Sequence, residues 1–263
     1  MKKIDSIQNP LIKEIEKLKK HPEDKIFIEG KNLIEAALNS PLSSIDKVLL
    51  TEEFAQTEIE FLKSIEDRAL PVIILSQKIA KKISDTVTPQ GIFALINYKI
   101  QTIKNISLKE PSLIVIADKI RDPGNLGTLI RVAEAFGTEV FFVTKETCNP
   151  FLPKTLRASA GSLFFFPIIK TDGKTIKEYI LKHKLSLVIT DPHAENLIFQ
   201  IDFKKPMALV FGNERQGVSE EISTISHIKC RIPHIGKTES LNVAISASIT
   251  LYEVLRQRTL SAM

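Results

Sequence analysis

The segment Ile232–Ala244 decides the fold, and it reads Ile-Pro-His-Ile-Gly-Lys-Thr-Glu-Ser-Leu-Asn-Val-Ala. An apolar run ends at Pro233, a residue that interrupts strands. Gly236 makes the following loop adaptable because glycine can adopt φ > 0. Two polar residues then flank Leu241, and a helix that ends near residue 258 follows. Alone, this pattern is typical of an ordinary strand–loop–helix connection, so its meaning depends on the rest of the chain.

The composition is typical of a globular protein. The chain has 263 residues, of which 43% are hydrophobic and 25% charged, and this length allows one large domain or two modest ones. We find neither an apolar run long enough to span a bilayer nor the apolar stretch of a signal peptide. Cys148 and Cys230 stand outside any Cys-x-x-Cys pattern. We therefore expect no metal site, no membrane association and reduced thiols in a cytoplasmic protein.

The net charge of +5 permits a polyanionic partner. Residues 1–110 hold 17 Lys+Arg and 16 Asp+Glu, and the rest of the chain holds 19 Lys+Arg and 15 Asp+Glu. The positive excess therefore lies mainly in the second part. A lysine-rich helix is nevertheless predicted within residues 5–20, opened by Asn9-Pro10 and with lysines at positions 13, 17, 19 and 20. Such a helix is either an ordinary solvated face or a contact surface for RNA phosphates.

Strands and helices alternate in the first part of the chain. Helices are predicted at 5–20, 31–39, 57–68 and 78–84, and strands at 27–30, 47–50, 71–75 and 91–96. This alternation indicates a small α/β domain over residues 1–100. The polar segment 101–111, which contains a proline, is interpreted as a linker.

The second part, residues 112–263, also alternates. Strands are predicted at 113–117, 139–143, 163–168, 185–190, 207–211 and 228–232, and helices at 126–136, 151–160, 176–183 and 218–225, before the C-terminal helix. The run Leu113–Ala117 is wholly apolar, as in parallel strands buried on both faces. We therefore predict an α/β domain with a parallel sheet.

Three segments of this second domain join a strand end to a helix start: 118–131, 209–217 and 232–244. Ligands of open α/β sheets bind at such places. A dinucleotide-dependent dehydrogenase would need Gly-x-Gly-x-x-Gly, which the spacing of Gly124 and Gly127 does not supply. Neither a phosphate-binding Walker loop nor a His-Glu-x-x-His zinc motif is present in the sequence.

Taken together, the three segments resemble the SpoU/TrmH family of RNA 2′-O-ribose methyltransferases, in the SPOUT class. The resemblance rests on Asp-Pro-Gly-Asn-Leu-Gly-Thr-Leu-Ile-Arg at 122–131, Phe-Gly-Asn-Glu at 211–214, and the 232–244 segment. A weaker family segment is similar to Pro153–Gly161. The match covers about residues 111–258, and residues 1–97 are similar to the family's ribosomal-protein-like α/β substrate-binding domain.

The resemblance implies a parallel-sheet domain with a C-terminal trefoil knot, preceded by the RNA-binding domain. It also implies S-adenosylmethionine as the cofactor, held largely through backbone groups of Gly212, Ile232 and Leu241. It further implies a homodimer whose site uses both chains.

The family assignment makes Arg131 the residue that activates the ribose hydroxyl. A free guanidinium is normally no base, so Arg131 either needs help from a phosphate and polar neighbours or stabilises the developing alkoxide. Candidates to orient Arg131 and the ribose are Asn125, Glu214, Ser240 and Asn242. For each of these four, a capping or loop-bracing role is the alternative.

The resemblance favours methyl transfer to structured RNA, with large-subunit ribosomal RNA as the preferred substrate. Two alternatives stay open at this point. One is a transfer RNA 2′-O-methyltransferase, and the other is a non-catalytic RNA-binding member of the same fold.

Overall fold

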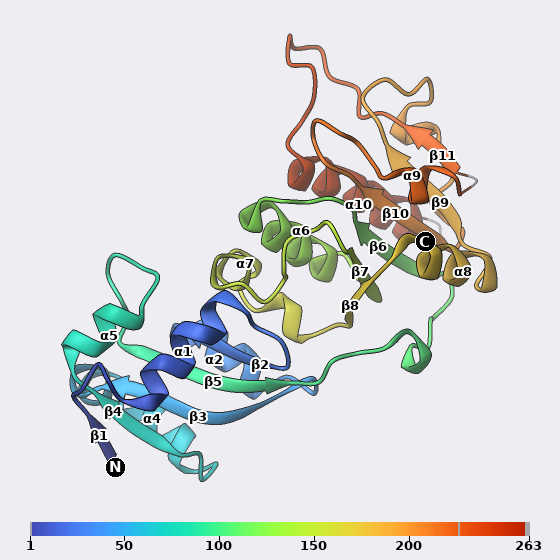
Figure 1. Ribbon diagram of the computed structural model, residues 1–263. Coiled ribbons are helices and arrows are strands. Elements are labelled where there is room, and N and C mark those ends of the chain that lie inside the picture. The colour runs from blue at the N-terminus through green and yellow to red at the C-terminus, as the bar shows by residue number, and fades with distance from the viewer. Residues whose placement is uncertain (1, 226, 261–263) are drawn as a thin grey trace. The chain divides into compact units, whose positions relative to one another are not determined.

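The computed structural model describes residues 2–225 and 227–260 (Figure 1). The chain forms two compact units. The first unit contains residues 1–100 together with 151–165, and the second unit contains residues 101–150 together with 166–263.

The first unit is built on a five-stranded sheet in the order β1-β4-β3-β5-β2. The strands are β1 (Lys2–Ile4), β2 (Lys25–Glu29), β3 (Ser43–Thr51), β4 (Val72–Leu75) and β5 (Ile92–Tyr98). β4 pairs in parallel with β1 and β3, whereas β5 pairs antiparallel with β3 and β2. The sheet is therefore mixed, and β1, which the sequence did not predict, forms one edge.

Two helices, α1 (Pro10–Lys20) and α5 (Gln77–Ile83), cover one face of this sheet. Ile12 and Ile15 of α1 join Ile79 and Ile83 of α5 in one core with residues of β2, β3 and β5. α1 begins at Pro10 because proline suits the first helical position. The side chain of Asn9 caps the helix by accepting a hydrogen bond from the backbone N–H of Leu11. The helix therefore opens at the Asn9–Pro10 pair, as predicted, and residues 5–9 of the predicted range 5–20 lie outside it.

The other helices of this half lie outside that core: α2 (Lys31–Leu38), α3 (Glu52–Thr57) and α4 (Ile59–Glu66). α2 packs against β2, β3 and β5. The Lys31 ammonium lies 5.2 Å from the centroid of the Phe61 ring, and the rings of Phe54 and Phe61 are 6.2 Å apart. These contacts join α2, α3 and α4 into one layer.

The segment 151–165 completes the first unit. It contains α7 (Pro153–Ser159) and a 3₁₀ turn, η2 (Ser162–Phe164). Gly161, with φ +89°, approaches α2 so closely that an added Cβ would lie 2.6 Å from the Cβ of Ala36. Ser40 Oγ donates to the carbonyl of Phe164 at 2.6 Å. The predicted strand at 163–168 is wrong here, because Leu163 and Phe164 are buried in the η2 turn and β8 begins only at Ile168.

The second unit is built on a six-stranded sheet in the order β11-β9-β10-β6-β7-β8, and every pairing is parallel. The strands are β6 (Leu113–Ala117), β7 (Val140–Thr144), β8 (Ile168–Thr171), β9 (Ser186–Thr190), β10 (Met207–Phe211) and β11 (His227–Cys230). β6, β7 and β10 are buried along their whole length. The predicted α/β class with a parallel sheet is confirmed.

The helices of the second unit are α6 (Pro123–Ala135), α8 (Gly173–Lys182), α9 (Glu220–Ser223) and α10 (Val243–Leu260), with short 3₁₀ turns η1 (Ile103–Asn105) and η3 (Ile198–Gln200). α6 packs against α10. Within 101–111, the side chains of Ile103, Ile106 and Leu108 pack against the core of this unit. No described helix is both long and apolar enough to cross a membrane, and the described residues contain no group of three or more potential metal ligands.

Candidate active site

The site begins where two central strands of the second unit end side by side. Phe211, the last residue of β10, pairs with Ala117, the last residue of β6. The loops that follow these strands therefore start from the same edge of the sheet, where ligands of open parallel sheets bind.

The loop after β10 is closed on itself. Asn213 and Gly217 exchange two backbone hydrogen bonds of 2.9 Å, and Asn213 Oδ1 accepts from the N–H groups of Arg215 and Gln216. A Cβ on Gly212 would lie 2.7 Å from the backbone carbon and oxygen of Gly217. Glycine at 212 is thus required by the fold of this loop, because the colliding atoms are backbone.

Three of the predicted catalytic residues meet in one hydrogen-bonded group, which we call the amide–carboxylate cluster: Asn125, Glu214 and Asn242. Asn125 Nδ2 donates to Glu214 Oε1 at 3.2 Å, and Asn242 Nδ2 donates to the same oxygen at 3.1 Å and to Asn125 Oδ1 at 3.0 Å. The three residues come from the starts of α6 and α10 and from the loop after β10. The three sequence motifs therefore converge through their polar side chains.

Two members of the cluster also hold the start of a helix. Asn242 Oδ1 accepts from Ala244 N at 3.0 Å, as an N-cap residue of α10 does. Glu214 Oε1 accepts from Val243 N at 3.2 Å. Capping and participation in the cluster are thus combined in Asn242, since its oxygen serves the helix and its nitrogen serves the cluster.

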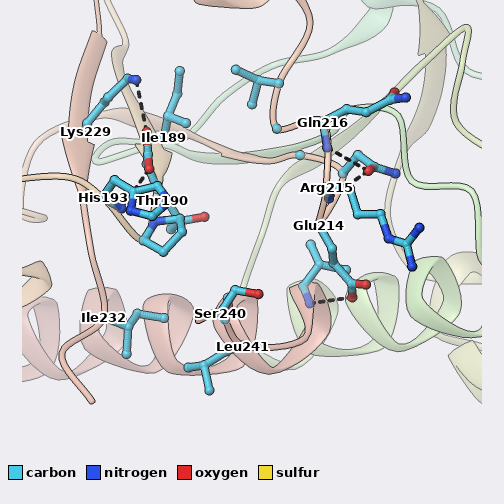
Figure 2. A pocket seen from close by; sticks show the side chains of 18 of the residues that line it. Ile189, Thr190, His193, Glu214, Arg215, Gln216, Lys229, Ile232, Ser240 and Leu241 are labelled. Carbon is cyan, nitrogen blue, oxygen red and sulfur yellow. Dashed lines mark hydrogen bonds and ion pairs between the residues drawn. The ribbon is translucent and has the colours of Figure 1, made fainter. Parts of the chain in front are cut away.

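A pocket of about 630 Å³ lies beside this cluster (Figure 2). All three predicted cofactor residues, Gly212, Ile232 and Leu241, line it, together with Glu214 and Ser240. Its volume is within the range of small-molecule and cofactor sites. In Figure 2, Ile232 and Leu241 provide apolar side chains along one side, and Glu214 lies toward one end.

The other end of the pocket is polar and was not predicted. It is lined by Thr190, the last residue of β9, by Asp191 and His193, which follow that strand, and by Lys229 of β11. Burial alone would raise the pKa of Asp191, but hydrogen bonds from the His193 backbone at 2.9 Å and from Lys229 at 3.0 Å outweigh it, and the pKa is lowered. The available signal was the Thr-Asp-Pro sequence at the end of a buried strand.

The loop between β11 and α10 is braced by its histidine. The ring nitrogens of His234 lie 3.2 Å from the carbonyl oxygen of Ile232 and 2.8 Å from that of Thr238. Thr238 Oγ1 donates to the carbonyl of Ser240 at 2.9 Å. Gly236, expected to use its freedom at φ > 0, does not adopt a positive φ.

Arg131 stands apart from the other predicted residues. It is exposed on α6 and does not line the pocket. Within the described part of the chain it has no hydrogen-bond or ion-pair partner. The structure therefore gathers Asn125, Glu214 and Asn242, places Ser240 at the pocket, and leaves the Arg131 guanidinium free.

Sequence reasoning also missed Asp118, a carboxylate that is only 1% exposed at the end of β6. Its Oδ2 accepts from the backbone of Ser219 at 2.5 Å, and its own N–H donates to Phe211. It therefore fixes the end of β6 to the exit of the loop after β10. An acidic residue directly after an apolar strand was the signal.

Comparison with known proteins agrees with this geometry. The model of the SpoU rRNA Methylase family matches residues 112–252, and the family model for RNA 2′-O ribose methyltransferase substrate binding matches residues 27–100. The first match contains the three motifs, and the second lies within the first unit.

Similar proteins extend over nearly the whole chain. An uncharacterised tRNA/rRNA methyltransferase of Synechocystis sp. is 30% identical over 97% of this chain and 94% of its own. The 23S rRNA (guanosine(2553)-2′-O)-methyltransferase RlmP of Bacillus subtilis is 28% identical over 97% and 99%. The solved structure of an AdoMet-bound rRNA methyltransferase from Sinorhizobium meliloti has a TM-score of 0.86 and 29% identity, covering 97% of each chain. With a matched family model over more than half its length and converging motifs, the chain belongs to the SpoU rRNA methylase family.

Proposed function

We propose that the protein transfers a methyl group from S-adenosylmethionine to a ribose 2′-hydroxyl of structured RNA, with large-subunit ribosomal RNA as the substrate. The observation that carries this proposal is the pocket lined by Gly212, Ile232 and Leu241 with the amide–carboxylate cluster beside it. The names of RlmP and of the Sinorhizobium enzyme support an rRNA substrate and this cofactor.

The residues present fit S-adenosylmethionine. Two aliphatic side chains, Ile232 and Leu241, can flank an adenine, and the polar end at Asp191 and Lys229 can pair with hydroxyl or charged groups. When bound, the cofactor supplies a methyl group on a positively charged sulfur. The protein must hold the ribose hydroxyl in line with that methyl group, and such positioning alone can provide much of the rate.

Within this proposal, Asn125, Glu214 and Asn242 position the reacting ribose. Glu214 Oε1 accepts three hydrogen bonds, from Asn125, Asn242 and the backbone of Val243, which fixes the carboxylate at the pocket edge. Ser240 supplies a hydroxyl on the pocket wall. Arg131 is exposed and has no partner among the described residues, so it can meet the substrate. It either gives one guanidinium proton to an RNA phosphate and then accepts the hydroxyl proton, or it stays protonated and stabilises the developing alkoxide.

The test separates this proposal from its alternatives. Calorimetric titration with S-adenosylmethionine measures cofactor binding, and tritium transfer to large-subunit rRNA and to bulk tRNA measures activity. We expect cofactor binding and transfer to rRNA. Transfer to tRNA alone would identify a tRNA methyltransferase, and RNA binding without either activity would identify a non-catalytic member.

We further propose which part of the chain performs each function. Residues 1–100 serve as the RNA-binding domain, 101–111 as the linker and 112–263 as the cofactor-binding methyltransferase domain, in a cytoplasmic enzyme. The substrate-binding family match at 27–100 supports the first assignment, and the pocket within the second unit supports the last. Cofactor affinity should therefore be insensitive to surface substitutions in residues 1–100.

We infer that the enzyme is a homodimer joined through α10. Ile245, Ile249, Tyr252 and Leu255 lie at helical spacing and are 53%, 36%, 57% and 43% exposed. The small residues Ser240, Ala244 and Ser248 stand four positions apart in the sequence, but they do not form the exposed face, since Ser240 precedes α10 and Ala244 is buried. Light scattering should give a dimer for the wild type and a monomer for Ile249→Glu, whereas Leu181→Glu, on the exposed face of α8, should remain dimeric. A monomeric wild type at micromolar concentration would contradict this inference.

We also propose that the chain from Ile232 onward threads a loop to form the trefoil knot. Gly212 and Leu241, from the two segments that would interlock, line one pocket. Pulling a single molecule by its ends should leave a tightened knot, so that the stretched chain is shorter than about 3.3–3.6 Å per residue allows. A full-length extension would show an unknotted chain.

A further inference from the structure

We propose that α1 and α5 together form a phosphate-binding surface that holds the RNA backbone during methylation. We call it the α1/α5 basic face, and it consists of Lys13, Lys17, Lys20, Lys78 and Lys81. This assignment rests on the proposed function, because the partner is the RNA substrate, and it identifies which surface of the first unit meets that RNA.

Charge in the first unit is sorted by layer. α1 carries four lysines and α5 three, against two glutamates in α1. The opposite layer of α2, α3 and α4 carries five glutamates and two lysines. Because residues 1–110 as a whole are almost neutral, the positive potential is concentrated on one face, which attracts polyanions to that face.

The two carboxylates of α1 are already occupied. Glu16 Oε1 lies 3.2 Å from Lys82 Nζ of α5, and Glu14 Oε1 lies 2.6 Å from Lys25 Nζ of β2. The five lysines of the α1/α5 basic face are exposed and, among the described residues, have no ion-pair partner. Their charge is therefore available to an external anion.

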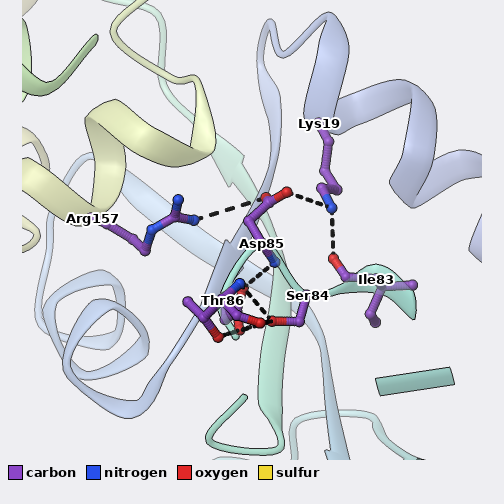
Figure 3. Close-up of polar contacts among 7 residues, drawn as sticks. Lys19, Ile83, Ser84, Asp85, Thr86 and Arg157 are labelled. Atoms are coloured by element: carbon purple, nitrogen blue, oxygen red, sulfur yellow. Dashed lines mark hydrogen bonds and ion pairs between the residues drawn. The ribbon is translucent and has the colours of Figure 1, made fainter. Parts of the chain in front are cut away.

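A polar lock holds the two helices together (Figure 3). Lys19 Nζ donates to the carbonyl of Ile83, the last residue of α5, at 2.8 Å and lies 2.8 Å from Asp85 Oδ1. Arg157 of α7 approaches the other oxygen of Asp85 at 3.8 Å. Together with the shared apolar core, this lock makes the face a preformed surface.

The spacing of the lysines supports binding to a polyanion. Lys13, Lys17 and Lys20 are separated by four and three positions, and Lys78 and Lys81 by three, so each set forms one row along its helix. Like charges at this spacing destabilise a helix by about 0.2–0.5 kcal/mol per pair. A row of phosphates would relieve this repulsion, which the protein's own carboxylates leave in place.

The side chains around the lysines suit binding to RNA better than binding to a membrane or to an apolar protein surface. Among the described residues of α1 and α5, no large hydrophobic side chain is exposed. Membrane-surface helices and the cores of protein interfaces present apolar or aromatic side chains. Phosphate contacts need only cations and make affinity depend steeply on salt.

The experiment compares two charge-matched double variants of the full-length protein. Lys17→Gln/Lys81→Gln removes two cations from the α1/α5 basic face, and Lys63→Gln/Arg68→Gln removes two exposed cations of the α4 region on the opposite layer. For each, the Kd for a large-subunit rRNA transcript is measured from 50 to 300 mM salt. Methyl transfer, cofactor affinity and Tm are recorded beside it.

We expect the α1/α5 variant to lower the slope of log Kd against log salt by about 1.4–1.8, which corresponds to about 0.7–0.9 per lost phosphate contact. The control variant should keep the wild-type slope, and both should bind S-adenosylmethionine normally. An equal change in the two variants, or none in either, would overturn the assignment. So would selective loss of binding to phosphatidylserine vesicles with RNA binding intact, which would identify a membrane surface. Absence of methyl transfer by the wild type, with the expected difference in slope, would defeat the catalytic proposal and leave this assignment standing.

Discussion

Asn242 donates a hydrogen bond from its side-chain amide to Glu214 Oε1 at 3.1 Å, across 28 positions of the chain. The same amide reaches Asn125 Oδ1, while the Asn242 oxygen caps α10. One side chain thus links the start of the last helix to both of the other motifs. Substitutions can separate its two roles, because only the amide nitrogen serves the cluster.

Asn242→Ser should retain stability and lose activity. Serine caps helices about as well as asparagine, but it cannot bridge Glu214 and Asn125 as the amide does. We expect methyl transfer to fall at least about tenfold, since each lost hydrogen bond to a charged group is worth about 1.5–3 kcal/mol. Asn242→Ala, which removes the cap as well, should lose about a further 1 kcal/mol of stability. Single-turnover methylation and thermal unfolding distinguish the two, and full activity in Asn242→Ser would remove the bridge from the mechanism.

Arg131→Ala should leave stability and cofactor affinity near the wild-type values, because Arg131 is exposed, lies outside the pocket and has no partner among the described residues. Turnover should fall by about 10²-fold or more, the usual scale for losing a proton-transfer group. Lys should not fully restore it, since an ammonium lacks the planar fork of a guanidinium. Wild-type turnover of Arg131→Ala would exclude the residue from catalysis.

Gly212→Ala should weaken cofactor binding at least about tenfold, because its Cβ would lie 2.7 Å from the Gly217 backbone and displace the loop that lines the pocket. Overpacking of this kind costs about 1–3 kcal/mol. Gly236→Ala is the matched control, since a Cβ there meets nothing within 4 Å and the backbone φ is not positive. Calorimetry on both variants checks the expectation, which fails if the two bind equally.

Arg258→Ala should destabilise the second unit far more than Arg256→Ala. The Arg258 guanidinium donates to the carbonyl oxygens of Phe203, Pro111, Ser112 and Lys205. Among the residues that the structure describes, Arg256 pairs only with Glu253 within α10. We expect a loss of about 2–3 kcal/mol for the first and about 0.2–1 kcal/mol for the second. Denaturant unfolding monitored by circular dichroism measures both, and equal losses would contradict the anchoring role.

Cys230 should resist alkylation at pH 8 in the folded protein, because burial raises the pKa of its thiol to about 11 and the thiolate is the reactive form. The raised pKa in the folded state makes a stabilising contribution that is present below pH 9 and lost as pH rises toward 11. Wild type minus Cys230→Ala should therefore show a difference in unfolding free energy that declines by about 1–3 kcal/mol over this range. Rapid labelling of Cys230 at pH 8, followed by mass spectrometry, would refute the burial argument.

Local patterns predicted most of the second unit well. The strand at 113–117 has the predicted bounds, because a continuous apolar run between polar segments marks a buried parallel strand. α6 starts three residues earlier than predicted, at Pro123, where Asp122 Oδ1 accepts from Asn125 N. The Asp122–Pro123 pair is a helix start signal in the sequence, and it marks the start of α6 better than the first apolar residue, Leu126, does.

Features that depend on distant partners were harder to predict. β1 is three residues long and exists by pairing with β4, 71 positions later in the chain from Lys2 to Ile73. The aromatic run at 163–168 has strand-like composition, yet Leu163 and Phe164 are buried in a turn. In both cases tertiary packing overrides local preference.

The candidate site shows the same difference between features set by local sequence and features set by distant partners. The motif residues around the pocket were predicted as a set, whereas Asp118 and the polar end at Asp191 were missed because each acts through a neighbouring strand or loop. Sequence spacing also placed Arg131 on the helix body beyond Asn125. That the Arg131 side chain has no partner among the described residues could be learned only from the structure.

The close approach of Gly161 to Ala36 limits how residues 1–100 can be exchanged between related proteins. Any side chain at position 161 would meet both the Cβ of Ala36, 2.6 Å from an added Cβ, and an unfavourable φ of +89°. A chimera that takes residues 1–100 from a relative must therefore take the matching 151–165 segment as well. The two segments therefore behave as one exchangeable piece, although fifty residues of the other unit separate them in the chain.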